Sequence, residues 1–172
     1  MPRFWLNRRR SDGPTREWDG FRPSDPDQAR RQLEQAKSII ERAVRLHPKA
    51  EAVIRACQQD DAKTGLLAAE GGEVREQYRR LREELRLLDL PSWLAGKLAS
   101  ILDHHLRLVS LALDLSYRRQ TARIRAQRHR LHGLGPSAGD LLALRDRLTE
   151  VLGQRWWPTG HWEGEPNGHR QR

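Results

Sequence analysis

The stretch Ser92–Leu115, SWLAGKLASILDHHLRLVSLALDL, decides the fold. In a helix, with about 100° between successive residues, its apolar side chains cover roughly half of the circumference. A face this broad is typical of a central helix that contacts several neighbours. The apolar run near its end is interrupted by Asp114 and is too short to cross a membrane, which takes about 20 predominantly apolar residues. We therefore predict a buried central helix and no membrane span.

The segments around this helix also have helical periodicity. A cap signal at Ser24–Asp27 precedes apolar residues spaced by three and four, and Pro48 is expected to end this first helix. Further helices are expected from Pro48 to Gly71, from Val74 to Leu88, and after a capping-box pattern at Ser137–Asp140. No segment alternates as a strand does. The sequence thus predicts an all-α fold: a small bundle of about five helices, with coiled-coil-like seams that would also allow a homodimer.

The helix that contains the opening stretch is expected to be long. Between Pro91 and Gly133 the sequence has no strong helix breaker, which predicts a helix of about 40 residues, or roughly 60 Å. In its second half Arg119, Arg123 and Arg130 occupy the sector that is apolar in the first half. Burial of unpaired charges is unfavourable, so we expect the basic C-terminal half to project from the bundle.

The positive charge of the chain is concentrated in this second half. The net charge is +9, with 32 basic and 23 acidic residues. Residues 115–139 hold six arginines and no acid, and residues 1–23 hold six bases and three acids, whereas the other segments balance. Codon bias in a GC-rich bacterium would explain the excess of arginine over lysine but not this surplus of bases. An acidic partner is therefore expected.

The leading functional hypothesis is a non-enzymatic nucleic-acid-binding protein that uses an Arg-rich helix at 115–132 for phosphate contacts. An acidic protein surface as the partner, or arginines that are merely solvated or paired with acids such as Glu83 and Glu84, remain alternatives. The residues expected to contact phosphate are Arg118, Arg119, Arg123, Arg125, Arg128 and Arg130, with Arg8, Arg9 and Arg10 as a second contact.

Two aromatic-rich tails are expected to flank the bundle domain. Residues 1–23 and 155–172 carry Gly and Pro without a helical period, around a domain at 24–154. Their aromatic side chains could pack on the domain, anchor a partner protein or stack on bases. The alternative function is thus a protein-interaction adaptor or assembly component. Its partner-binding residues would be Trp5, Trp18, Trp156, Trp157 and Trp162.

No pattern in the sequence indicates catalysis or a cofactor. His104 and His105 are adjacent, and adjacent helical residues do not face a common point, so no metal site is expected there and His105 is expected in the core. His129 and His132 could share a helix face, but the arginines around them would oppose a cation. Cys57 is the single cysteine, which rules out an internal disulfide and fits a cytoplasmic location. The N-terminus lacks the apolar stretch of a secretory signal.

Overall fold

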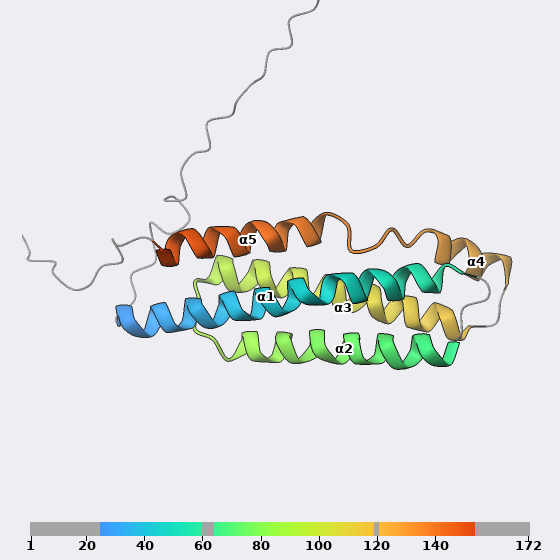
Figure 1. Cartoon of the computed structure of the whole chain (residues 1–172), viewed down its shortest axis with the longest axis horizontal. Helices are drawn as coiled ribbons and strands as arrows, with labels where there is room; N and C mark the ends of the chain where they lie inside the picture. The colour runs from blue at the N-terminus through green and yellow to red at the C-terminus, as the bar shows by residue number, and fades with distance from the viewer. Residues whose placement is uncertain (1–24, 60–63, 119–120, 154–172) are drawn as a thin grey trace, which may run out of the picture.

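The computed structural model describes residues 25–59, 64–118 and 121–153 (Figure 1). These residues form five helices and no strand, which confirms the all-α prediction. The helices are α1 (Pro26–Cys57), α2 (Thr64–Arg86), α3 (Ser92–Tyr117), α4 (Ala122–His129) and α5 (Pro136–Gly153). Among the described helices, none combines the length and the apolar character that a bilayer span requires.

Four long helices lie side by side, and α1 and α3 form the centre of the bundle. Both α1 and α3 contact α2 as well as α5, and they contact each other. Helices α2 and α5 lie on opposite sides of this central pair (Figure 1). The predicted apolar face of α3 is buried, including Leu94, Leu98 and Val109, and so is the expected stripe of α1, including Leu33 and Ile40.

Helix α1 continues through Pro48, so the predicted end of the first helix at this residue is wrong. A proline inside a helix removes one backbone hydrogen bond and costs roughly 3 kcal/mol. The apolar face is continuous across it, with Leu46 and Ala50 buried on either side, while Pro48 itself is exposed. Burial of this face offsets the missing bond. Of the segment predicted as a second helix, residues 48–57 form the end of α1 and residues 64–71 form the start of α2.

Helix α2 continues through Gly71 and Gly72, where the sequence predicted a break. Gly71 is buried against the central pair, and a Cβ at this position would lie 2.5 Å from Cδ2 of Leu113 and 3.1 Å from Cγ1 of Val53. The missing side chain therefore lets α2 approach both α1 and α3 closely. This packing outweighs the helix penalty of glycine, which is about 1 kcal/mol.

The expected helix of about 40 residues is not formed, and its basic half does not project. Helix α3 ends at Tyr117, because Arg118 has extended backbone angles (φ −76°, ψ 145°). Helix α4 starts after Thr121, whose Oγ1 accepts a hydrogen bond from the Ile124 amide at 3.2 Å. The chain then returns along the bundle towards α5 (Figure 1). This reversal buries Leu131 and Leu134, which a straight helix would carry into solvent.

Candidate functional site

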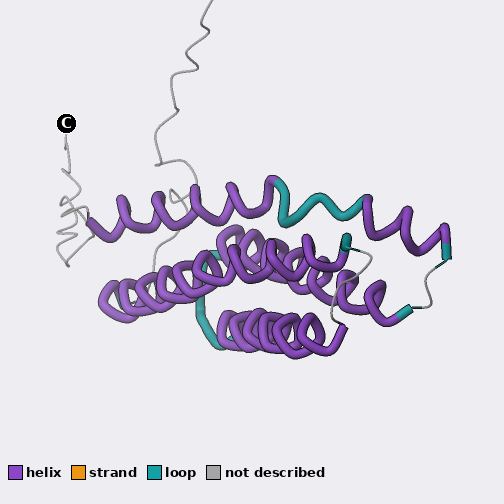
Figure 2. Tube along the Cα trace, turned by 45° about the vertical axis from the view of Figure 1, so that its right-hand side comes forward, coloured by secondary structure: helices purple, strands orange, loops and turns teal. Residues whose placement is uncertain are grey.

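Residues 121–134 lie beside the ends of α1 and α3, at the end of the bundle where α2 begins, and we call them the end cap (Figure 2). Leu131 and Leu134 join the hydrophobic core. The Leu134 amide donates a hydrogen bond to Oε1 of Glu51 on α1 at 2.7 Å. Gly133 has a positive φ of 70°, and a Cβ there would collide with the Glu51 carboxylate, so only glycine fits this turn. The end cap is thus fixed to the bundle by both apolar and polar contacts.

Arg128 fastens the end cap to the last turn of α1. Its side chain is only 2% exposed. The guanidinium Nε donates to the carbonyl of Cys57, and Nη2 donates to the carbonyl of Gln59 at 2.6 Å. The last carbonyls of a helix lack partners within the helix and carry partial negative charge, so a cation there satisfies them. The predicted phosphate contact of Arg128 is therefore wrong, because its guanidinium is buried and bonded to backbone.

The other described arginines of the basic segment are exposed. Arg118, Arg123, Arg125 and Arg130 have no ion pair within residues 25–59, 64–118 and 121–153. Glu84, which the sequence offered as a partner for them, instead pairs with Arg42. Arginines of the long helices often have such partners; examples are Arg30 with Glu34, Arg82 with Asp103, and Arg79 and Arg80 with Glu76. The end cap therefore presents positive charge that nearby described residues do not neutralise.

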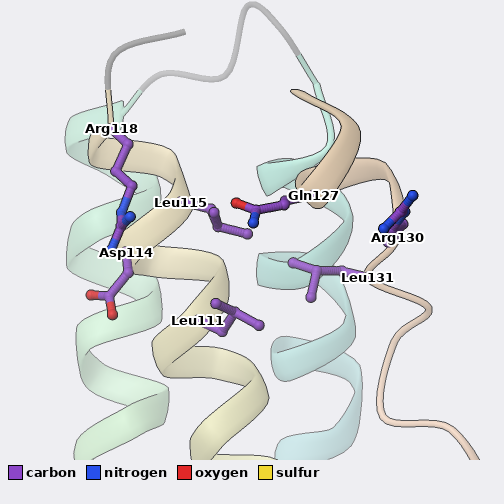
Figure 3. A pocket seen from close by; sticks show the side chains of 7 residues that line it. All are labelled: Leu111, Asp114, Leu115, Arg118, Gln127, Arg130 and Leu131. Atoms are coloured by element: carbon purple, nitrogen blue, oxygen red, sulfur yellow. The ribbon is translucent and has the colours of Figure 1, made fainter. Parts of the chain in front are cut away.

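A hollow of about 440 Å³ lies between the end of α3 and the end cap (Figure 3). Leu111 and Leu115 from α3 face Gln127 and Leu131 from the end cap across it. Arg118 and Asp114 also belong to its α3 side, but the Asp114 carboxylate points away from Gln127 and Leu131, and Arg130 points outward on the opposite side. Sequence reasoning missed this hollow, because it exists only once the chain reverses between α3 and α4.

Apart from the hollow, a cluster of four polar side chains lies in the middle of the bundle, one from each long helix: His47, Tyr78, His105 and Ser137. The His105 ring is fully buried and packs edge-on against His47 and Tyr78, at centroid distances of 5.2 and 5.4 Å. Burial of His105, expected from its position on the apolar face, is thereby confirmed.

Hydrogen bonds define the protonation of His105. The Ser137 hydroxyl donates to the Leu134 carbonyl at 2.7 Å, so His105 Nε2, 3.0 Å from that hydroxyl oxygen, carries the hydrogen. Burial, together with the neighbouring His47 and His104, lowers the pKa of His105 to about 4. The ring is neutral near pH 7 and belongs to the core.

The described residues do not bring together three His, Cys, Asp or Glu side chains that could hold a metal ion. Several predicted site residues lie outside the described part of the chain, namely Arg8, Arg9, Arg10, Arg119, Trp5, Trp18, Trp156, Trp157 and Trp162. The chain matches no protein-family model, no curated protein and no solved structure.

Proposed function

We propose that the protein is a non-enzymatic helical protein that binds nucleic acid through phosphate contacts of its end cap. The observation that carries this proposal is the group of four exposed arginines without a described ion-pair partner. They follow Asp114 in a stretch without any acidic residue before Asp140. Phosphates of a nucleic acid would supply the negative charge that the chain does not place here.

The geometry suggests a patch on the bundle end rather than an arm that lies along a groove. Helix α4 has only eight residues, of which Arg128 is buried, and Leu131 just after it joins the core. Arg123, Arg125 and Arg130 lie on the exposed side of this turn, and Arg118 adds a contact from the end of α3. Such a patch fits a short length of phosphate backbone, and cytoplasmic nucleic acid remains the predicted ligand.

The test is equilibrium titration of fluorescent duplex and single-stranded oligonucleotides at about 50 and 200 mM salt, a range over which multi-phosphate contacts weaken strongly. Replacement of Arg118, Arg123, Arg125 and Arg130 by Gln should abolish binding. A matched control replaces four exposed arginines of α2 by Gln, which removes the same charge elsewhere: Arg75, Arg79, Arg80 and Arg86. Equal losses in the two variants, or no binding at the lower salt, would contradict the proposal.

The alternative function, a protein-interaction adaptor, is favoured by a different surface. Leu87, just after α2, is 83% exposed and lines a surface groove with Ile39 and Leu88. Contiguous exposed apolar patches mark sites of protein contact. Deletion of residues 155–172 or the substitution Leu87→Ser should then remove the partner without unfolding the bundle. An unfolded truncation would instead assign the tryptophans of this tail to the core.

A further inference from the structure

We propose that mild acid releases the end cap from the bundle, because the attached end cap covers two histidines that must stay uncharged. These are His47 on α1 and His105 on α3, whose rings pack edge-on at a centroid distance of 5.2 Å. We call them the histidine pair. Release of the end cap is measured on the chain alone, without nucleic acid, and it therefore goes beyond the proposed function.

A row of hydrogen bonds joins the histidine pair to the end cap. His105 Nε2 lies 3.0 Å from the Ser137 hydroxyl, which donates to the Leu134 carbonyl at 2.7 Å. The Leu134 amide donates to Oε1 of Glu51, which follows His47 by one turn of α1. Leu134 and His105 are both 0% exposed, so the attached end cap shields this side of the buried ring. When Leu134 leaves, the same side of the ring is open to water.

The attached form disfavours a proton on either ring of the pair. Nε2 of His47, Nδ1 of His105 and Oη of Tyr78 are buried and have no hydrogen-bond partner among the described residues. A proton would add a charge to a site whose polar atoms already lack partners, which is unfavourable. Burial accordingly lowers the pKa of both histidines, whereas a hydrated histidine titrates near pH 6.5. The attached form is therefore favoured above this pH and loses population to the detached form as the pH falls.

The groups that face the pair from the other elements do not reverse this preference. Glu51 on α1 favours a proton on the nearer ring, but in the attached form its carboxylate also accepts the Leu134 amide. Tyr78 on α2 is neutral, because burial raises its pKa. On α3 the side chain of His104 opposes a charge on the pair, and α5 contributes the uncharged Ser137. Detachment frees the Glu51 carboxylate to pair with an imidazolium, so acid also stabilises the detached form.

Cys57 provides a native probe for this detachment. It is the single cysteine of the chain, is 0% exposed and lies in the last turn of α1. Arg128 fastens the end cap to the carbonyl of Cys57 itself. The neighbouring Gln58 side chain donates to the Leu131 carbonyl of the end cap. The thiol should therefore become reactive when the end cap leaves the bundle.

The experiment measures how fast 4,4′-dithiodipyridine, a disulfide reagent that also reacts in acid, modifies Cys57 between about pH 7.5 and pH 5. The rate in the folded full chain is divided by the rate in the urea-unfolded chain at the same pH, which removes the pH dependence of the thiol itself. This ratio should rise by up to about tenfold per pH unit below roughly pH 6.5 for each proton taken up. Urea should change the ratio only weakly, as for a local opening.

Variants test the roles of the named side chains. His47→Gln removes one titrating ring and should flatten the rise on acidification. A matched control replaces the exposed His129 and His132 of the end cap by Gln, and it should keep the full rise. Glu51→Ala removes the acceptor of the Leu134 amide and should increase the ratio already at neutral pH. Glu51→Gln keeps an acceptor oxygen and should increase it less. Circular dichroism would verify that each variant is folded.

Three results would overturn acid release of the end cap through the histidine pair. The first is a ratio that stays constant down to about pH 5, or that rises equally in His47→Gln and in the unmodified chain. The second is loss of the rise in the control variant, which would assign the release to charge repulsion within the end cap. The third is a steep dependence of the ratio on urea, which would assign the exposure of Cys57 to global unfolding.

Discussion

Arg128 differs from the other arginines of the end cap in what its side chain does. Its guanidinium satisfies two carbonyls at the end of α1, and it is buried. We expect Arg128→Ala to lower the free energy of unfolding by about 2–3 kcal/mol, since it leaves buried acceptors without a partner. Arg125→Ala, at an exposed site of the same helix, should change it by less than about 0.5 kcal/mol. Urea unfolding of both variants checks this prediction. If Arg128→Ala changed the free energy of unfolding as little as Arg125→Ala, the hydrogen bonds of Arg128 would contribute nothing to stability.

His105 makes stability depend on pH. Its folded pKa of about 4 lies below the value of about 6.5 expected in the unfolded chain. Below pH 6.5 the unfolded state therefore binds a proton that the folded state does not. Stability is fully present above this pH and should fall by about 1.4 kcal/mol per pH unit towards pH 4. His47, whose pKa is also lowered by burial, adds to the same trend.

The measurement is urea unfolding of the unmodified chain and of His105→Leu between pH 4 and 7. The variant lacks the titrating ring, so its loss of stability on acidification should be shallower. Parallel pH profiles for the two proteins would show that the buried imidazole is not the origin of the acid sensitivity.

At the scale of the element, the two adjacent glycines of α2 have opposite roles. A Cβ at Gly71 would meet Leu113 and Val53, whereas one at Gly72 would meet no atom within 4 Å. Gly72→Ala should therefore raise the free energy of unfolding by about 0.5–1 kcal/mol through helix propensity. Gly71→Ala should lower it by about 1–3 kcal/mol through overpacking. Thermal unfolding of the two variants would give melting temperatures on opposite sides of that of the unmodified chain; two stabilised variants would contradict the close approach of α2.

These elements also show what the sequence could predict. The period of the apolar residues was sufficient for the all-α class and for the buried face of α3. It was insufficient for the helix boundaries, because Pro48 and Gly71 carry local signals to break a helix that tertiary burial overrides. Conversely, residues 92–132 carry no strong local break, and the chain nevertheless leaves the helix at Arg118 because Leu131 and Leu134 are buried by turning back.

The candidate site, like the fold, could be predicted from the sequence only in part. The absence of acids around the basic segment predicted exposed arginines, and four described ones are exposed. The burial of Arg128 could not be predicted, since its partners are carbonyls at the end of α1, about 70 residues earlier in the chain. The hollow with Asp114 and Gln127 depends on the same reversal of the chain. Contacts across such sequence distances leave no local pattern.

At the scale of the whole molecule, the basic segment that contains no acidic residue lies at one end of the bundle. Helices α1, α2, α3 and α5 bury one core, which Leu131 and Leu134 of the end cap join, while its exposed side carries arginines. The long helices thus form the scaffold and the end cap forms the proposed contact surface. Removal of the exposed arginines should therefore affect binding and leave the fold unchanged.

The most direct test of this account is the salt dependence of nucleic-acid binding. We predict that the logarithm of the binding constant falls with the logarithm of salt concentration with a slope of roughly −3 to −4, for four phosphate contacts. In the variant with Gln at positions 118, 123, 125 and 130, the slope should fall close to zero together with the affinity. Identical slopes for this variant and the unmodified chain would contradict the assignment of phosphate binding to the end cap.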